Sequence, residues 1–396
     1  MTIRYNTGIV KNGLLLYYDI SNTSKCFIGA PTTNSQWNNG SEFSPWSNNG
    51  GLVTDVTGTQ EAGPIIGAKT WRFEKTGTGN QWHGWESTFG GIFSGSSGDV
   101  WSCSYWYKTS SSASNFSNFL LYVADWSRAY SFTQLVVQNS LIPDGKWHRN
   151  YISTQINEAY SNAIIADGPS WQYSTSAGIL WINGLQWEKN PYSSAFAKGT
   201  RTATQGLIDL SGNGYSLDLT NARFGYDGNL KFDNAVANSR IQTNCAPTLG
   251  DFTIGVWFKA TGNSGGYDRI IDSLYNSGIA LMRNSTNANS WGGGVAEGNS
   301  PYGIFLTLQD GAWHYLVSIR KGTTHTLYGD GVANTVSNTV SNNALPATSY
   351  AIGNWTGAQG NQPFMGEIPI VQIYDRALSI DEVMQNFEAH RSRFGI

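Results

Sequence analysis

The sequence predicts an all-β protein made of two jelly-roll or β-sandwich modules, with a short helix at the C-terminus. Composition is the first observation behind this prediction: 13% of the 396 residues are charged, while glycine (46), tryptophan (16), tyrosine (20) and phenylalanine (17) are plentiful. Surface helices need Lys, Glu and Arg, whereas strands favour aromatic residues and their loops favour Gly, Asn and Ser. The second observation is a strand-and-turn pattern that occurs twice in the chain.

The first copy of this pattern is GDVWSCSYWYK at residues 98–108, followed by Asp-Gly-Lys-Trp-His at 144–148. The second copy is GDFTIGVWFK at 250–259, followed by Asp-Gly-Ala-Trp-His at 310–314. In each copy a Gly-Asp turn precedes an aromatic and β-branched run, and an Asp-Gly turn precedes a strand that opens with Trp-His. Tryptophans at these repeated positions are expected to lie in the two cores: Trp106, Trp147, Trp257 and Trp313.

Further strands follow from β-branched and alternating runs between turn-rich segments. The strands are expected at 9–19, 69–74, 99–108, 118–124, 147–154, 179–188, 228–233, 251–259, 269–273, 303–308, 313–320, 324–329, 349–353 and 364–374. The last element is predicted to be a helix, because Ser379 and Glu382 have the spacing of a capping box. Its apolar face, which we expect to pack on the second sandwich, consists of Ile380, Val383, Met384 and Phe387.

Charge and hydropathy exclude several classes of partner. The net charge is −3 and no Lys/Arg run is present, so nucleic acid is not an expected partner. No apolar run approaches the roughly 18 residues of a membrane span, and the first residues lack a hydrophobic signal core. We therefore expect no membrane insertion and synthesis in a cytoplasm without Sec export. Three scattered cysteines fit neither a disulfide framework nor a zinc site, and Cys103 is expected to be a small buried hydrophobe.

Several segments of the chain resemble one family. Residues 12–23 (NGLLLYYDISNT) and 25–34 (KCFIGAPTTN) resemble the opening of many tailed-bacteriophage structural proteins that contain concanavalin A-like, laminin G-type domains. The segments LIDLSGNGYSLDLTN and GEIPIVQIYDRALSIDEVMQNFEAHRSRFG resemble the rest of that domain. In the usual arrangement the GLxLxxD strand runs almost directly into the DLSGN segment, but a long segment separates them here. The resemblance implies a discontinuous laminin G-like domain, with its first strand in 1–28 and the remainder in 204–396.

The intervening residues 29–203 have relatives of their own. The segments DGKWHR, LWINGLQWEKNPYSSAF and KGTRTAT resemble the carbohydrate-binding-module-like jelly rolls of phage virion proteins. We therefore expect residues 29–203 to form an inserted jelly roll, so that one sandwich of concanavalin A-like type contains the other.

Catalysis is not expected. Glycoside hydrolases need two carboxylates across the scissile bond, and the Glu-x-Asp-x-x-Glu run of the laminarinase relatives is missing from this sequence. The acidic pair Asp381-Glu382 is better explained as helix-start charge. No His-Glu-x-x-His or Walker motif is present either. His148 and His314 follow the repeated tryptophans, which suggests a shared structural role, and the chain is predicted not to be an enzyme.

Aromatic residues among Gly, Asn and Ser in the loops have the composition of a glycan site. Sugar rings present apolar C–H faces that stack on aromatic rings, while Asn, Asp and Arg bond the hydroxyls. The candidates are Trp82, Trp85, Trp126, Arg128, Trp171, Tyr173, Tyr267, Trp291 and Trp355. The alternative that such aromatics close the ends of the cores or face neighbouring subunits stays open.

No cofactor is expected and the metal content is unknown from sequence. The resemblance implies that loops such as Tyr226-Asp227-Gly228 or Tyr267-Asp268 could hold a structural calcium ion, although the sequence supplies no full set of oxygen ligands.

Two classes of function remain open. The first is a phage virion structural protein, either a capsid decoration or a tail-fibre-like appendage, located on the virion and made in the host cytoplasm. Its expected partners are other virion proteins and host surface polysaccharide, and many copies or a homo-oligomer are expected on each particle. The second is a cellular polysaccharide-binding lectin or a glycoside-hydrolase-like enzyme of the concanavalin A-like fold. The missing export signal favours the first class, because a cellular extracellular lectin would need one.

Overall fold

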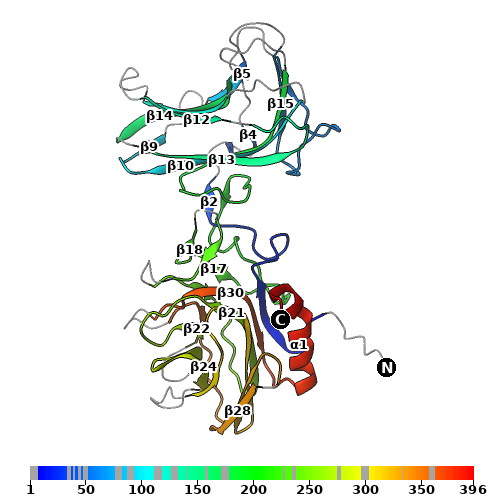
Figure 1. Cartoon of the computed structure of the whole chain (residues 1–396), viewed down its shortest axis with the longest axis vertical. Helices are drawn as coiled ribbons and strands as arrows, with labels where there is room; N and C mark the ends of the chain where they lie inside the picture. The colour runs from blue at the N-terminus through cyan, green and yellow to red at the C-terminus, as the bar shows by residue number, and fades with distance from the viewer. Residues whose placement is uncertain are drawn as a thin grey trace. The chain divides into compact units, whose positions relative to one another are not determined.

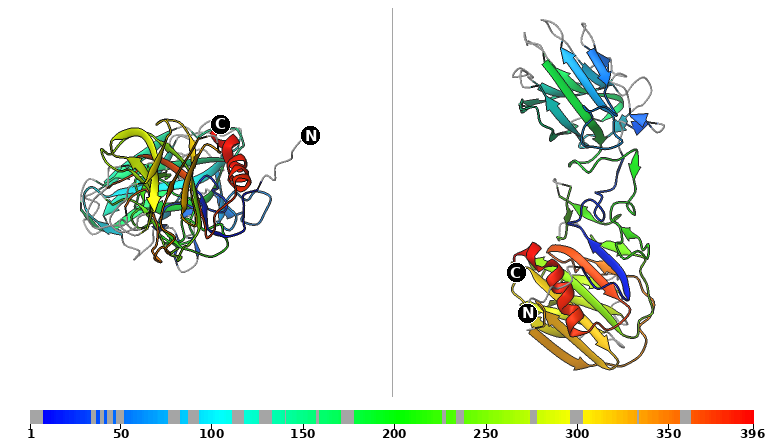
Figure 2. Two further views of the ribbon diagram at one scale, coloured as in Figure 1. Left: turned by 90° about the horizontal axis from the view of Figure 1, so that it is seen from below. Right: turned by 90° about the vertical axis from the view of Figure 1, so that its right-hand side faces the viewer.

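In its described residues, the computed structural model is mostly β, with one helix near the C-terminus (Figures 1 and 2). It describes residues 8–33, 37–38, 41–42, 46–47, 52–75, 83–86, 93–110, 118–125, 133–139, 141–156, 159–170, 178–225, 228–233, 238–273, 278–295, 303–332, 334–355 and 362–396.

The chain divides into two compact units. The split unit comprises Met1–Pro31, Thr202–Gly225 and Asn229–Ile396, and the inserted unit comprises Thr32–Arg201 with Tyr226–Gly228. The breaks therefore fall within three residues of the 28/29 and 203/204 boundaries expected from the sequence. The predicted pairing of the first strand is confirmed: β1 (Leu14–Asp19) pairs antiparallel with β30 (Gly366–Tyr374), far away in the sequence.

Two antiparallel sheets form the sandwich of the split unit. The first sheet has the order β1, β30, β21 (Phe252–Ala260), β26 (His314–Lys321), β27 (Thr324–Gly329), β28 (Asn334–Thr339). The second has the order β17 (Leu217–Asp218), β20 (Ile241–Thr243), β29 (Ala351–Ile352), β22 (Arg269–Asp272), β23 (Ile279–Asn284), β24 (Asn287–Val295), β25 (Ile304–Thr307). A short pair, β18 (Arg223–Phe224) and β19 (Leu230–Lys231), lies outside these two sheets. Alternate residues of β21, such as Ile254 and Val256, enter the core between the two sheets.

The helix α1 (Ile380–Phe394) covers the outer face of the first sheet, beside β1 in Figure 1. The predicted capping box is confirmed, since Ser379 and Glu382 cap each other's backbone N–H. Val383 and Phe387 are buried against Trp257 of β21, whereas Ile380 is 55% exposed, so its placement on the packed face was wrong. With the helix in place β21 is buried on both faces, which explains its nearly unbroken apolar run.

A pH-dependent contribution of Glu382 follows from this capping box. The Arg376 guanidinium donates to Glu382 at 2.8 and 2.5 Å and lowers the pKa of the Glu382 carboxyl to about 2. A carboxyl with a depressed folded-state pKa adds stability that is fully present above its unfolded pKa and lost as the pH falls through the folded value. Glu382→Gln should therefore lower the urea midpoint at pH 7, with the difference from the unmodified protein shrinking from about pH 4.5 toward pH 2. A difference that stays constant over this range would contradict the assignment.

The inserted unit also contains two antiparallel sheets. The first has the order β13 (His148–Gln155), β10 (Val100–Thr109), β15 (Gly178–Glu188), β7 (Thr70–Lys75), β6 (Leu52–Asp55). The second has the order β12 (Thr133–Asn139), β11 (Asn118–Asp125), β14 (Tyr160–Ser170), β8 (His83–Glu86), β5 (Trp46–Ser47), with β9 (Phe93–Gly95) also on β14. Two short pairs complete the unit: β2 (Thr32–Thr33) with β16 (Thr200–Arg201), and β3 (Trp37–Asn38) with β4 (Ser41–Glu42).

The two copies of the sequence pattern occupy equivalent places in their sheets. Strand β10 lies between β13 and β15, and β21 lies between β26 and β30, so each Gly-Asp strand is flanked by its Trp-His strand and by a strand from later in the same unit. In register, Tyr107 faces His148 and Phe258 faces His314. Cys103 is buried in β10, as predicted.

The prediction that all four repeated tryptophans are core residues is correct only for Trp257, which is fully buried. Trp106, Trp147 and Trp313 are half-buried. Trp106 points to the face of β10 opposite the core residues Cys103 and Tyr105. Trp147 and Trp313 precede the first residue of their strands, so they lie at the strand entrance and not within the sheet.

Five described strands of six or more residues were not expected, besides several shorter ones: β12, β14, β23, β24 and β28. In β24 the run Gly292-Gly293-Gly294 has the composition of a turn, yet it forms part of a central strand. A Cβ on Gly293 would overlap the carbonyl oxygen of Ala280 on β23. The glycines therefore permit close approach of neighbouring backbones and do not break the strand.

No helix in the described ranges is long and apolar enough to cross a membrane.

Candidate functional site

Most of the loop candidates named from the sequence fall in segments that the structure does not describe. Trp82, Trp126, Arg128, Trp171 and Tyr173 lie outside the described residues, as does Asp227. Trp85 is placed by its backbone in β8, where it pairs with Asp167 of β14. The glycan-site hypothesis for these residues stays a prediction.

Trp291 is not a surface residue, so its inclusion as a glycan candidate was wrong. Its side chain is fully buried in the core between the two sheets of the split unit. The indole Nε1 donates to Asp310 Oδ1 at 3.2 Å, and the Arg283 guanidinium carbon lies 4.3 Å from the ring centroid. No face of this ring is available for a sugar.

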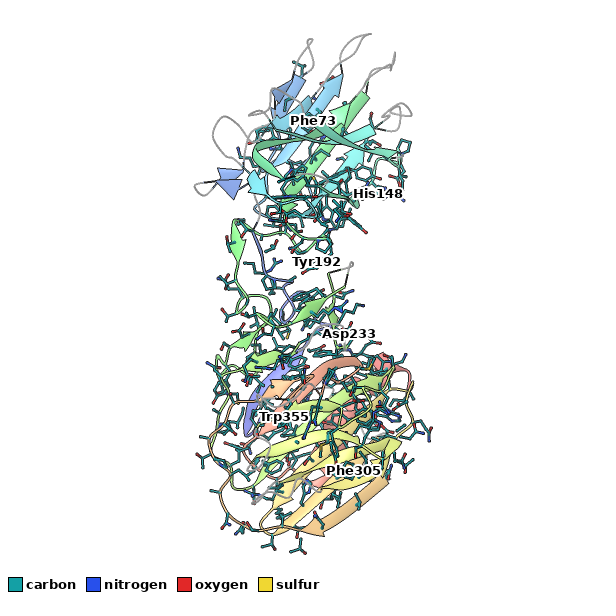
Figure 3. The ribbon with its side chains drawn as sticks, turned by 90° about the vertical axis from the view of Figure 1, so that its left-hand side faces the viewer. Phe73, His148, Tyr192, Asp233, Phe305 and Trp355 are labelled. Carbon is teal, nitrogen blue, oxygen red and sulfur yellow. The ribbon has the colours of Figure 1, made fainter. Side chains whose placement is uncertain are left out.

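Tyr267 and Trp355 are both half-buried, and the structure brings them together around one cation. The guanidinium carbon of Arg269 lies 5.9 Å from each ring centroid, and Arg269 Nε donates to Gln362 Oε1 at 2.9 Å. Figure 3 labels Trp355 in this region. Arg269 is itself only 1% exposed and lies 3.2 Å from Asp272. The two rings therefore lie beside a buried ion pair within β22 of the second sheet.

The proposed calcium ligand Asp268 has another role. Its carboxylate is fully buried, accepts from Arg283 Nε at 2.7 Å and also accepts from the hydroxyl of Ser264. A carboxylate neutralised by an arginine is a poor cation ligand, which corrects the expectation for the Tyr267-Asp268 loop. Among the described residues, no group of three or more His, Cys, Asp or Glu is placed to hold a metal ion.

A groove of about 430 Å³ is a candidate ligand site in the split unit. Segments from five parts of the chain line it: the turn after β1, the β19 strand, the entrance of β26, the start of β30 and the last turn of α1. Its lining residues are Ile20, Ser21, Thr23, Phe27, Asn229, Leu230, Lys231, Phe232, Trp313, Gly366, Glu367, Ile368, Pro369, Arg393 and Phe394.

Trp313 supplies the aromatic surface of this groove. Its ring centroid lies 4.7 Å from that of Phe394, and the Lys259 ammonium lies 5.7 Å from the ring centroid. Lys259 pairs with Glu367 in the register of β21 and β30, so a positively and a negatively charged residue occupy neighbouring positions in this sheet. The half-buried indole is thus fixed by packing on one side while it lines the groove.

The wall formed by the end of α1 is held by a bidentate ion pair. Arg393 donates to the two carboxylate oxygens of Asp19 at 2.7 and 2.9 Å, and Asp19 is buried. Burial, together with the positive charge of Arg393, lowers the pKa of the nearby His390 to about 4. His390 is therefore neutral at physiological pH and does not compete with Arg393 for Asp19.

The groove has the chemistry of a binding site. Ser21 and Thr23 provide hydroxyls, Asn229 an amide and Lys231 an ammonium group, beside the indole of Trp313. Glu367 is the single carboxylate among its described lining residues. Hydrolysis with two facing carboxylates would need a second acid, and the described lining supplies Glu367 alone. Sugar binding by stacking and hydrogen bonding needs an aromatic ring and polar groups, and the groove supplies both.

Sequence reasoning missed this site because it assigned Trp313 to the core. The available signal was the position of Trp313 directly after the Asp310-Gly311-Ala312 turn, where a side chain lies at the strand entrance. The other lining segments are adjacent only through the fold, and the sequence contained no signal that joins them.

Comparisons with known proteins agree with the fold. Residues 233–384 match the family model of the concanavalin A-like lectin/glucanases superfamily, in its laminin G group. The split unit thus has a concanavalin A-like sandwich fold, and its residues 233–384 are similar to that family. No curated protein sequence matches the chain.

Among solved structures, the ligand-binding domain of botulinum neurotoxin serotype D in complex with N-acetylneuraminic acid is 17% identical, with a TM-score of 0.37 over 48% of this chain and 49% of that one. A sialidase of Trypanosoma rangeli in complex with 2,3-difluorosialic acid is 16% identical, with a TM-score of 0.36 over 48% of this chain and 31% of that one. The chain thus spans about half or less of these structures. Similarity with such low identities and TM-scores supports no conclusion about the ligand or the activity of this chain.

Proposed function

We propose that this protein is a non-enzymatic display protein of a tailed-bacteriophage particle, in which the groove at Trp313 binds a host surface glycan. The observation that carries the glycan half is the groove itself, where a fixed indole stands beside hydroxyl, amide and charged groups. Sugars are recognised by this combination, because their C–H faces stack on the ring and their hydroxyls bond to the polar groups.

The virion half rests on sequence resemblance. The NGLLLYYDISNT and DLSGN segments resemble phage structural proteins, and here they meet in one element: β1 is bonded along its edge by Asp209, Ser211 and Asn213. An inserted jelly roll of carbohydrate-binding type adds a second candidate binding module. Mass spectrometry and immunogold imaging of particles from the producing host would test this half; absence of the protein from purified particles would leave a cellular lectin as the better account.

Trp313→Ala should weaken glycan binding about tenfold, which corresponds to roughly 1.4 kcal/mol of binding free energy. The reason is the loss of the stacking surface, so Trp313→Phe should retain most of the affinity. A glycan array of bacterial surface polysaccharides, followed by titration calorimetry with the best ligand, provides the measurement. Trp106→Ala is the matched control, because Trp106 is a half-buried tryptophan of the inserted unit and does not line the groove.

The two variants separate the possible locations of the site. Normal binding by Trp313→Ala would overturn the assignment to this groove, and a loss confined to Trp106→Ala would move the site to the inserted unit. Absence of binding for both single and multivalent forms of the unmodified protein would favour a purely structural role on the particle.

The non-enzymatic part is tested separately. Purified protein incubated with the polysaccharide that it binds should release no new reducing ends over several hours. Sustained release that is lost in Glu367→Gln would establish a hydrolase acting through the one carboxylate of the groove.

A further inference from the structure

Strand β28 is the last strand of the first sheet of the split unit (Figure 1), and among the described strands it pairs with β27 alone. The ladder continues at Val340, whose N–H donates to the carbonyl of Thr323 at 2.9 Å. In an antiparallel ladder the residues that bond to the partner alternate with those that do not. Val336 and Asn338 therefore bond to β27, while the N–H and C=O groups of the residues between them point away from the sheet.

Three residues thus present free backbone groups along this edge: Thr335, Ser337 and Thr339. Their side-chain hydroxyls do not fold back onto these groups. Ser337 Oγ lies 2.9 Å from Thr326 Oγ1 on the sheet face, and Thr335 Oγ1 donates to Val332 O at 2.8 Å. Within the described part of the chain, no hydrogen bond reaches the outward backbone groups of the three residues.

The opposite edge of the same sheet is closed. Leu210 N donates to Tyr17 O at 2.7 Å, and Tyr17 N donates to Asp209 Oδ1 at 3.0 Å. Asn213 Nδ2 donates to the carbonyl oxygens of Leu14 and Leu15 at 2.9 and 2.8 Å. The chain therefore blocks one edge with a dedicated loop, whereas the described residues form no hydrogen bonds to the outward backbone groups of the other.

Edge strands in natural proteins are usually protected from pairing by charges, prolines or bulges. None of these occurs in β28. Its pairing with β27 is regular over all six residues, and the sequence has no charged residue from Gly331 to Gly366. The nearest proline, Pro346, lies beyond the strand. Because β28 carries no charge, another strand can pair with this edge without electrostatic repulsion. The added strand can be β28 of a second copy.

We propose that β28 is a self-association edge, at which a second copy of this chain adds its own β28 antiparallel about Ser337. The outward residues read Thr-Ser-Thr, so a two-fold axis at Ser337 places Ser337 opposite its mate and Thr335 opposite Thr339 of the second copy. Each facing pair of this type exchanges two backbone hydrogen bonds. Thr–Thr pairs across strands add a further favourable contact. The first sheet of one split unit and the first sheet of the other copy's split unit then form one continuous sheet.

This contact is small, because it uses one strand from each copy. Interfaces that bury less than about 1,200 Å² are typical of weak or transient association. Concentration-dependent dimerisation is therefore expected, and many copies on one surface would strengthen it.

Sedimentation velocity over a wide concentration range tests the proposal with two matched variants. Ser337→Pro removes the outward N–H at the centre of the edge, where proline is tolerated because the ladder with β27 does not use that group. Ser337→Ala loses the same hydroxyl but keeps the N–H. We expect the unmodified protein and Ser337→Ala to dimerise alike and Ser337→Pro to dimerise at least tenfold more weakly, with unchanged thermal unfolding. Equal dimerisation by all three, or a strict monomer for the unmodified protein, would overturn the proposal.

A cysteine at the axis tests the register without relying on proline. Ser337→Cys places two thiols on facing residues with Cα atoms about 5.5 Å apart, within the range for a disulfide. The three natural cysteines are buried, so background cross-linking is low. Mild oxidation should convert this variant to a covalent dimer, while Ser285→Cys, an exposed position at the turn between β23 and β24, should remain monomeric. Equal cross-linking of the two variants would contradict the proposed edge.

Discussion

Trp257→Ala is expected to lower the free energy of unfolding by about 3–5 kcal/mol, the range for truncating a large core aromatic. The Trp257 ring is fully buried between β21 and α1. Its centroid lies 5.1 Å from Tyr315, 5.6 Å from Phe387 and 4.4 Å from Phe394, so truncation removes contacts on both sides of the indole. Urea unfolding followed by circular dichroism gives the measurement.

Two further variants make this prediction specific to burial. Trp106→Ala, at the equivalent position of the inserted unit, should cost clearly less because that ring is half-buried. Trp257→Phe should recover part of the loss, since an aromatic ring still contacts the helix. Should Trp257→Ala cost no more than Trp106→Ala, α1 would not form a stable layer on the first sheet.

This comparison shows what the repeat could and could not predict. Trp106 and Trp257 occupy the same position in the pattern, and both point away from the core between the sheets. The strands that carry them have equivalent neighbours in their sheets, in line with the two modules of related plan that the repeat predicted. Burial differs because α1, more than a hundred residues after Trp257, covers one ring, whereas the inserted unit shows no described helix. Alternation within a strand identifies two faces, but it contains no information about what covers the outer one.

The candidate site was less predictable than the fold. Strands such as β21 and β26 have strong local signals, whereas the groove joins Ser21, Lys231, Trp313, Glu367 and Arg393 from separate segments. The family resemblance predicted that β1 and the segments after residue 203 belong to one domain, and β1 does pair with β30. It did not predict Trp313 as a lining residue. The Trp-His sequence at the start of a strand is the same whether the indole packs in a core or lines a groove.

Arg283→Met is expected to lower the free energy of unfolding by about 3–5 kcal/mol, because it leaves a buried carboxylate without its counter-charge. Asp268 and Arg283 are both fully buried. Arg283 also donates to Asp310 Oδ2 at 2.5 Å and to the carbonyl of Gly262 at 2.6 Å, so the loss affects two loops at once. Urea unfolding at pH 7 would measure it.

A double-mutant cycle separates the unpaired charge from the lost packing. Asp268→Asn removes the charge but retains a group that can bond to Ser264 Oγ, the other partner of Asp268. Combined with Arg283→Met it should therefore recover a substantial part of the single-variant loss, because no buried ion is then left unpaired. Strict additivity of the two substitutions would contradict this account and would mean that Arg283 stabilises the unit through its contact with Trp291 and its bonds to the loops, with no energetic coupling to Asp268.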